Sequence, residues 1–388
     1  MERAWLRDRI VERNAFCSPF FEEQALPLAR AASEMALRFS EGGRLLAFGR
    51  GAYATDAMHL SVEFIHPVLV GKRALPALDV SAAPHAFISA VAGPRDMAIA
   101  LGPPQGDAAL EDALVTARRC GAFTIAWPRP SISLHADYGV AAPVNDVHVH
   151  QELFELMGHT MYESVHVFLE HLSHHERVSE VGFLYPFLSE SADDPEGLIA
   201  EVATSILAKA RDADELRRRV ATEQLDALCD AIAAIRARLA RGGRILAFGN
   251  GGSATDATDF VLDCVDPEVG WPAVPAISLA LEPAVITATA NDVGVDVIFL
   301  RQLIAQSKPN DIMLAFSTSG GSRNIVAALE EGRKRGLLGV ALLGCDGGEI
   351  VRRNLADVAI VVPCDFIPRI QEAQGTIYHV LREALARA

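Results

Sequence analysis

Several features that define other classes of protein are absent from this sequence. No run of about 18 uncharged apolar residues occurs, so we expect no membrane-spanning helix and no membrane partner. The first residues, MERAWLRDRIVERN, contain no apolar stretch of the signal-peptide type. The six cysteines lie far apart and form no CxxC pair, which predicts reduced, mostly buried thiols without a redox or metal role. Together these absences predict a cytoplasmic protein.

Positive charge is also scarce. The chain has 35 Lys and Arg residues against 50 Asp and Glu residues, a formal net charge of −15. A nucleic-acid partner is therefore not expected, because no basic face is available to replace phosphate counterions. Half of the residues are hydrophobic and 22% are charged, which is typical of a globular protein. A length of 388 residues suits two domains rather than one core.

One segment of the sequence occurs twice. Gly42–Ala57 (GGRLLAFGRGAYATDA) and Gly242–Ala257 (GGRILAFGNGGSATDA) are offset by 200 residues and identical at 12 of 16 positions. Each predicts a buried strand, a glycine-rich turn and the start of a helix. The offset grows to 215 where PRDMAIAL at 94–101 matches PNDIMLAF at 309–316, so the first copy lacks a counterpart of Asn291–Gln306. The chain is thus a duplicated domain.

Short apolar runs alternate with helical periodicity in both copies, which predicts parallel α/β sheets with helices on both faces. We expect the first domain at 1–173, a linker at 174–197 and the second domain at 198–388. The expected strands are 45–49, 96–101 and 123–127 in the first copy, and 245–249, 276–279, 311–316, 340–343 and 358–362 in the second.

A serine-rich loop, Ser317–Ser322 (STSGGS), lies between a predicted strand and a predicted helix. Unpaired amide groups at a helix N-terminus, together with small hydroxyl side chains and glycines, are suited to hold a phosphate. The loop has no lysine of the GK[ST] type, so it is not an NTPase loop. A plain capping turn is the alternative interpretation. The position at the carboxyl end of a strand favours a ligand site.

Five motifs in the second copy resemble a known family in their order along the chain. They are GNGGSATDA, ATANDVGVDVIFLRQL, AFSTSGGSRNI, LLGCDGG and PRIQEAQGTIYHVL. They resemble the phosphoheptose isomerase branch of the sugar isomerase (SIS) domain superfamily over nearly all of 198–388, and the first copy resembles it more weakly over about 20–173. The resemblance implies two flavodoxin-like SIS domains of three α/β/α layers. It also implies isomerisation of sedoheptulose 7-phosphate to a heptose 7-phosphate through an enediol(ate).

The resemblance divides the family's site unevenly between the copies. The second copy keeps the sugar-phosphate positions: Asn250, Gly251, Ser253, Asp292, Ser317, Thr318, Ser319 and Ser322. Its acid/base positions hold Gln371, His379 and Asp263, although the family has glutamate at the last of these. The first copy has His59, Glu63, Gln151 and His159 at the corresponding positions. Its phosphate motifs are replaced by Arg50–Tyr53 and Gly102–Asp107.

The first-copy set is compatible with a metal ion. His59 and Glu63 lie four residues apart and share one helix face. Together with Gln151 and His159 they offer a donor set that suits Zn²⁺, which members of the family often carry on such residues. We expect no cofactor to be required, with zinc as the candidate metal.

The catalytic role of the second copy leaves alternatives open. Asp263 could act as a weakened base, because a misplacement of ~1 Å costs on the order of 10²-fold in rate. Alternatively, Glu63, His59 or His159 of the first copy complements the phosphate contacts of the second; unchanged turnover in a Glu63→Gln variant would refute this hypothesis. The rival function is non-catalytic: a sugar-phosphate sensor, or a regulator that binds a protein such as the replication initiator DnaA. In either case duplication predicts a homodimer with four SIS domains.

Overall fold

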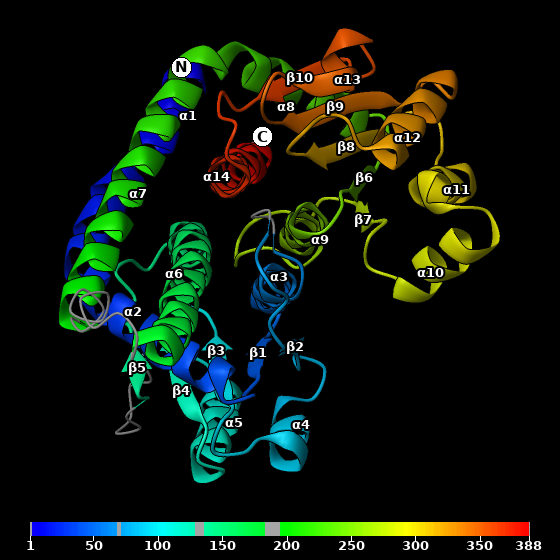
Figure 1. Ribbon diagram of the computed structural model, residues 1–388. Helices are drawn as coiled ribbons and strands as arrows, with labels where there is room; N and C mark the ends of the chain where they lie inside the picture. The colour runs from blue at the N-terminus through cyan, green and yellow to red at the C-terminus, as the bar shows by residue number, and fades with distance from the viewer. Residues whose placement is uncertain (1, 68–70, 129–135, 183–194, 388) are drawn as a thin grey trace. The chain divides into compact units, whose positions relative to one another are not determined.

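The computed structural model describes residues 2–67, 71–128, 136–182 and 195–387, with side chains as far as 172 in the third range (Figure 1). The chain forms two compact units. The first unit is Ala15–Asp212, and the second unit combines Met1–Asn14 with Ala213–Ala388. These units assign 1–14 and 198–212 differently from the domains expected from the sequence. None of the described helices is long and apolar enough to cross a membrane.

The first unit contains a parallel sheet of five strands in the order β2-β1-β3-β4-β5. Its strands are β1 (Leu45–Gly49), β2 (Ala77–Asp79), β3 (Met97–Leu101), β4 (Phe123–Trp127) and β5 (Tyr138–Gly139). Its helices are α2 (Asn14–Ser40), α3 (Tyr53–Ile65), α4 (Pro84–Val91), α5 (Ala108–Arg119) and α6 (Val147–Gly182). Side chains of α4 and α5 share one core with β1 and β3, while aromatic contacts join α2, α3 and α6.

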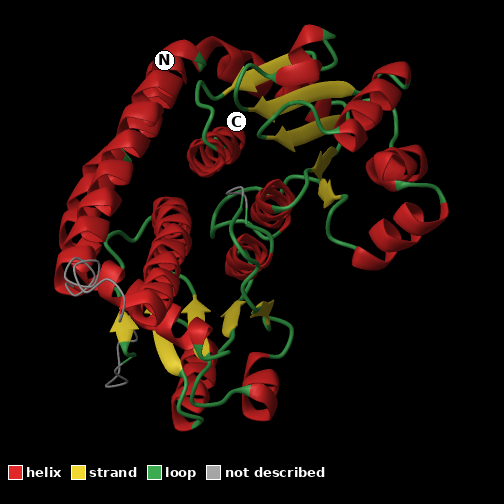
Figure 2. Ribbon diagram, viewed as in Figure 1, coloured by secondary structure: helices red, strands yellow, loops and turns green. Residues whose placement is uncertain are grey.

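The second unit repeats this order as β7-β6-β8-β9-β10. Its strands are β6 (Ile245–Phe248), β7 (Ala276–Ser278), β8 (Ile312–Ser317), β9 (Leu338–Leu343) and β10 (Val358–Val361). Its helices include α1 (Glu2–Val11), α8 (Leu225–Leu239), α9 (Gly252–Val265), α11 (Ile298–Gln306), α12 (Arg323–Lys334), α13 (Gly348–Arg352) and α14 (Ile367–Ala386). Figure 2 shows helices around both sheets.

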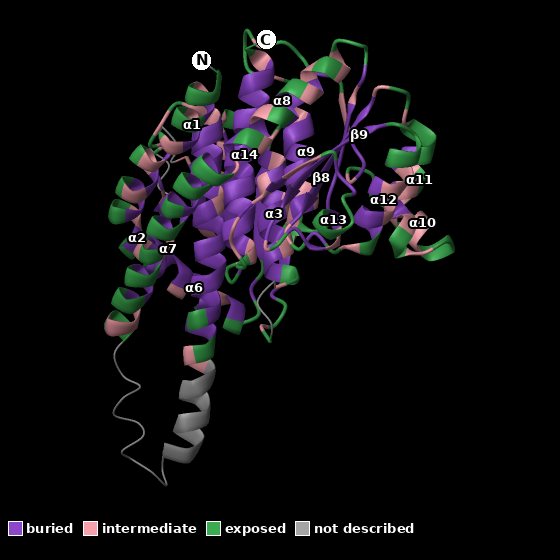
Figure 3. Ribbon diagram, turned by 90° about the horizontal axis from the view of Figure 1, so that it is seen from above, coloured by how far each residue is buried: buried purple, intermediate pink, exposed green. Residues whose placement is uncertain are grey.

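Alternation along β6 shows the three layers directly. Ile245 and Ala247 face a core with α1, α8, α9 and α14, whereas Leu246 and Phe248 face a core with α11, α12 and α13. Successive strand residues point to opposite faces, so a strand covered on both sides reads as a continuous apolar run. Every residue from Pro368 to Leu385 of α14 is buried (Figure 3). The predicted α/β/α class and parallel pairing are confirmed.

The structure contains, in the second unit, the segment that the first copy was expected to lack. Between β2 and β3 the first unit has α4 alone, whereas between β7 and β8 the second unit has α10 (Pro283–Asp292), a 3-10 turn η2 (Val295–Val297) and α11. Both ends of the expected linker at 174–197 are helical. Helix α6 continues to Gly182, α7 (Pro195–Glu223) begins at Pro195, and residues 183–194 lie outside the described part.

The strand order determines where the glycine-rich turn and the serine loop of the second unit lie. In a flavodoxin-like sheet of order 2-1-3-4-5, the connections leave in opposite directions after the first and third strands, and a crevice opens between their carboxyl ends. In the second unit these strands are β6 and β8. The loops that follow them contain the glycine-rich turn and the serine loop.

Candidate functional site

The serine loop leads directly into α12. Ser317 ends β8, and Ser322 is the N-cap residue of α12 but accepts no hydrogen bond there with its side chain. Within the loop, the Gly320 amide donates to Ser317 Oγ at 3.1 Å and the Gly321 amide donates to Ser319 Oγ at 3.2 Å. Thr318, Ser319 and Ser322 are at least partly exposed. The helix N-terminus and these hydroxyls are therefore accessible to an anion.

The glycine-rich turn after β6 lies next to this loop. Asn250 and Asn324 exchange side-chain amide hydrogen bonds of 2.9 and 2.8 Å, which tie the turn to the first turn of α12. Gly251 has φ +56°, and a Cβ on Gly249 would lie 2.3 Å from the Ser253 carbonyl oxygen, so this turn requires glycine. Ser253 is buried in the first turn of α9. The structure thus brings both predicted phosphate motifs together.

Asp292 lies apart from them. It is the last residue of α10, it is exposed, and its carboxylate accepts a hydrogen bond of 2.8 Å from the Asn291 amide. No hydrogen bond joins it to the serine loop within the described residues. The connection is indirect, because η2 packs against α12 and the Asp296 carboxylate lies 3.4 Å from Arg323. A ligand role for Asp292 stays a prediction.

The predicted acid/base residues of the second unit meet between α9 and α14. His379 Nε2 lies 3.5 Å from Asp259 Oδ2 and 3.9 Å from Asp263 Oδ2. The Tyr378 hydroxyl donates to Asp259 Oδ2 at 2.8 Å and fixes that carboxylate. Gln371 is buried two turns before His379 on the same helix. This cluster pairs a carboxylate with an imidazole, which suits proton transfer.

The phosphate contacts and this cluster occupy different turns of α9. Ser253 lies in the first turn, and Asp263 is ten residues further on. At 1.5 Å per residue the two positions are about 15 Å apart along the helix axis. A substrate that touched both would have to extend over most of that length.

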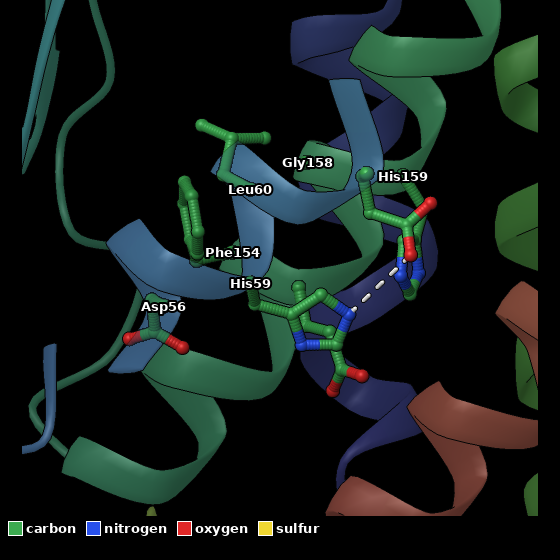
Figure 4. Close-up of a pocket in the computed structure, with 8 residues that line it drawn as sticks. Asp56, His59, Leu60, Phe154, Gly158 and His159 are labelled. Carbon is green, nitrogen blue, oxygen red and sulfur yellow. Dashed lines mark ion pairs between the residues drawn. The ribbon is translucent and has the colours of Figure 1, made fainter. Parts of the chain in front are cut away.

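The first unit has its own cluster of histidines and carboxylates. His59 and Glu63 on α3 and Glu155 and His159 on α6 line a small cavity (Figure 4). His59 Nε2 lies 3.8 Å from Glu63 Oε1, and the rings of His59 and His159 are 5.3 Å apart. Ligand atoms of His59, Glu155 and His159 all lie within 4.8 Å of one another.

These residues fit a zinc ion on chemical grounds. Two imidazoles and a carboxylate are ordinary zinc ligands. The cavity leaves about 10 Å³ for the centre of a water-sized sphere, which is room for one small ion or one water. The Glu63 Oε2 atom is buried and has no hydrogen-bond partner within the described residues. A buried carboxylate oxygen without a partner is costly, and a cation would stabilise it.

Gln151, the fourth predicted metal ligand, has another contact. Its amide donates to both carboxylate oxygens of Asp56, at 3.2 and 3.0 Å. Glu155, one turn further along α6, takes part in the cluster instead. Sequence reasoning missed Glu155, although its position four residues before His159 places both on one helix face.

The first unit fills its own anion site. Asp107 is the N-cap of α5 and accepts from the amides of Ala109 and Leu110 at 2.8 and 3.3 Å. Arg50 Nη1 lies 3.0 Å from the other oxygen of this carboxylate. Asp107 is 215 positions before Ser322, the offset of this part of the repeat. An internal carboxylate therefore stands where the second unit has a hydroxyl.

Part of this chain is similar to known proteins in sequence. The SIS domain family matches residues 210–344. With the repeated sheet and the serine loop, this match makes the chain a SIS-domain protein. A phosphoheptose isomerase from Pelobacter propionicus is 38% identical over 170 residues, 44% of this chain and 89% of that protein. Another, from Geobacter sp. (strain M21), is 42% identical over 147 residues, 38% of this chain and 76% of that protein. The chain belongs to the phosphoheptose isomerase family.

A solved structure extends the likeness to the whole chain. Tagatose-6-phosphate ketose/aldose isomerase from Escherichia coli matches with a TM-score of 0.57 and covers 99% of this chain and 92% of that one. At 14% identity this likeness shows the fold alone.

Proposed function

We propose that the protein is a sugar-phosphate aldose–ketose isomerase that converts sedoheptulose 7-phosphate to a heptose 7-phosphate. The observation that carries the proposal is the accessible serine loop, which follows β8 at the crevice between the carboxyl ends of β6 and β8. The same unit also contains the Asp263–His379 cluster. The relatives are phosphoheptose isomerases, which supports the same substrate class. Ser317, Thr318, Ser319, Ser322 and Ser253 would hold the phosphate, with Asn250 and Gly251 shaping the turn.

The proposed chemistry is a proton transfer between C1 and C2. Asp263 removes a proton from C1 of the ketose while His379 gives a proton to the carbonyl oxygen on C2, which forms an enediol. Asp263 then returns the proton to C2, and His379 takes the hydroxyl proton of O1 as the aldehyde forms. The 3.9 Å between Asp263 and His379 lets both act on neighbouring atoms. Gln371 would hydrogen-bond the substrate oxygens.

Zinc is proposed as a ligand of the first unit. His59, His159 and Glu155 or Glu63 would hold it, and Zn²⁺ there would act as a Lewis acid or as a structural ion. His159 and Glu63 remain candidates for acid/base work, which the Glu63→Gln variant tests. No step of the proposed isomerisation depends on this ion.

A deuterium experiment tests the function. The full chain is incubated with sedoheptulose 7-phosphate in D₂O, and the C1 and C2 protons are followed by NMR. Deuterium at C2 of a heptose product supports the isomerase. Binding of the sugar phosphate without exchange or product supports a sensor instead, a rival that the shorter carboxylate at Asp263 favours. A sensor or a regulator that binds a protein such as DnaA does not need Asp263 as a base. It would therefore keep its affinity for the sugar phosphate in an Asp263→Asn variant.

We further propose a cytoplasmic homodimer with four SIS domains. Light scattering coupled to size-exclusion chromatography should give twice the chain mass of 41.6 kDa. A measured mass equal to that of a single chain would refute the dimer. It would not bear on the isomerase activity, which the deuterium experiment tests separately.

A further inference from the structure

The loop between β9 and α13 supports the serine loop from behind. A Cβ on Gly320 would lie 2.1 Å from the Gly347 carbonyl oxygen, and a Cβ on Gly344 would lie 2.7 Å from the Thr318 carbonyl oxygen. The Ile350 amide also donates to the Gly320 carbonyl at 3.1 Å. The two backbones are therefore in direct contact, and a displacement of residues 344–348 would move Thr318–Gly320.

Cys345 lies in this supporting loop, next to a second cysteine. Its amide donates to the carbonyl of Cys364 at 3.0 Å, just past the ends of β9 and β10. β9 and β10 are neighbouring parallel strands, and neighbouring strands lie about 4.7–4.9 Å apart. This spacing is within the Cα separation of about 4.4–6.8 Å that a disulfide spans. Both thiols are free and partly exposed. Only Cys17 and Cys264 are fully buried, so the expectation of mostly buried thiols was wrong.

The surroundings of the two sulfur atoms differ. Cys364 Sγ accepts a hydrogen bond of 3.5 Å from the amide of Phe366, the N-cap residue of α14. Burial, with the nearby Asp365 and Asp346 carboxylates, raises the pKa of the Cys345 thiol. Cys345 also has φ +53°, in the left-handed region that non-glycine residues seldom adopt. These differences favour Cys364 as the thiol that reacts first with an oxidant, and Cys345 as the thiol that then reacts with the oxidised Cys364.

We propose that Cys345 and Cys364 are a peroxide-sensitive thiol pair whose oxidation to a disulfide weakens anion binding at the serine loop. The Cys364 sulfur attacks hydrogen peroxide, the O–O bond breaks, and a sulfenic acid and one water form. The Cys345 sulfur then attacks the Cys364 sulfur, the S–S bond forms, and the S–O bond breaks with release of a second water. The two thiols lose two hydrogens and two electrons, and the peroxide is reduced to water.

The effect on ligand binding follows from the shared backbone contact. Drawing Cys345 onto Cys364 shifts residues 344–348 and with them the amides of Thr318–Gly320. Because coupling between two sites is reciprocal, bound sugar phosphate must disfavour the disulfide by the same factor by which the disulfide weakens binding, typically about 5- to 150-fold. This regulatory part rests on the proposed function, whereas formation of the disulfide does not.

The thiol chemistry is tested first, on the full chain. The reduced protein is treated with one equivalent of hydrogen peroxide and digested without reductant. Mass spectrometry should find a Cys345–Cys364 peptide with a loss of about 2 Da, reversible by dithiothreitol. Cys345→Ser and Cys364→Ser should abolish it, and Cys229→Ser, another partly exposed thiol of the same unit, should not. Bridges to other cysteines, or stable sulfinic acid without a bridge, would overturn the pair.

Binding is tested next, by calorimetry with sedoheptulose 7-phosphate on the reduced and oxidised wild-type protein. The oxidised form should bind at least about fivefold more weakly. Equal affinities in the presence of a complete disulfide would overturn the regulatory role. Absence of binding by the reduced protein would overturn the proposed function instead, while the mass result would still stand.

Discussion

The guanidinium of Arg50 lies 3.0 Å from the carboxylate of Asp107, and this carboxylate caps the helix that begins there. The corresponding cap in the other copy, Ser322, leaves its helix N-terminus accessible. The duplicated loop therefore exists in two states, one filled by its own side chain and one able to accept an anion. Among the residues that differ between the two loops, Arg50 in place of Asn250 and Asp107 in place of Ser322 supply the ion pair and the capping carboxylate of the first copy.

A Ser322→Asp variant should convert the second loop into the state of the first. A carboxylate at this cap would repel the phosphate, and like charges in contact cost several kcal/mol. We expect affinity for sedoheptulose 7-phosphate to fall by about 100-fold or more, which corresponds to about 2.8 kcal/mol. Calorimetric titration measures it. The matched control is Asp107→Ser, which keeps a preferred N-cap residue, so it should cost little stability and should keep its affinity. Equal losses of affinity in both variants would contradict this assignment.

The length of the side chain at 263 should control turnover. Asp263 is one methylene shorter than the glutamate expected from the family resemblance, and ~1 Å of misplacement costs on the order of 10²-fold in rate. Asp263→Glu should therefore raise kcat with little change in KM, and Asp263→Asn should remove activity. Initial rates at saturating sedoheptulose 7-phosphate measure this. If Asp263→Asn retained wild-type kcat, the proposed base would be wrong.

Zinc affinity should distinguish the two candidate ligand sets of the first unit. Glu155→Gln should weaken binding at least about 10-fold, because even partners of metal ligands contribute 10–100-fold. Gln151→Leu should change it little, since the Gln151 amide is engaged by Asp56. Competition against a chromophoric chelator measures both. The reverse order of effects would restore Gln151 to the metal set.

Two buried histidines should make stability depend on pH. Burial lowers the pKa of His150 to about 4, despite its hydrogen bond to the Gly102 carbonyl; burial likewise lowers the pKa of His166 to about 4. A histidine with a depressed native pKa contributes stability that is complete above the unfolded pKa of about 6.5 and is lost as pH falls toward 4. For His150 this loss is about 2 kcal/mol between pH 7 and pH 5.

A His150→Phe variant keeps a ring against Trp127, on which His150 stacks at 4.7 Å, and removes the titration. Its free energy of unfolding should therefore fall by about 2 kcal/mol less than that of the wild type between pH 7 and pH 5. Urea denaturation at both values measures it. An unaltered drop in His150→Phe would mean that His150 does not titrate in this range.

Sequence patterns predicted the strands well, because a strand buried on both faces is a continuous apolar run bounded by glycines. β1, β4 and β8 were found within one residue of their expected bounds. Two strands of the first copy were not predicted, the three-residue β2 and the two-residue β5, because such short strands carry little pattern. In the candidate site, local spacing predicted His59 beside Glu63 and the serine loop. The pairing of Tyr378 with Asp259 depends on how two helices pack, which spacing along one helix does not encode.

The N-terminal helix shows the clearest limit of local reasoning. Leu6 and Ile10 belong to the core of the second unit, and the buried Arg13 donates to Glu383 at 2.9 Å across 370 residues of sequence. Neither MERAWLRDRIVERN nor the last helix identifies the other as its partner.

The contact between Arg13 and Glu383 can form only after nearly the whole chain has been synthesised. Chains grow at about 5–20 residues per second, so Arg13 is exposed for roughly 20–70 s before Glu383 is made. By the time Glu383 is made, the whole of Ala15–Asp212 has already been synthesised, whereas the core that α1 joins is completed only with α14. A gene divided between the two repeats would separate the helix from its partners, so the halves would need to be expressed together, or the first fourteen codons moved to the second half.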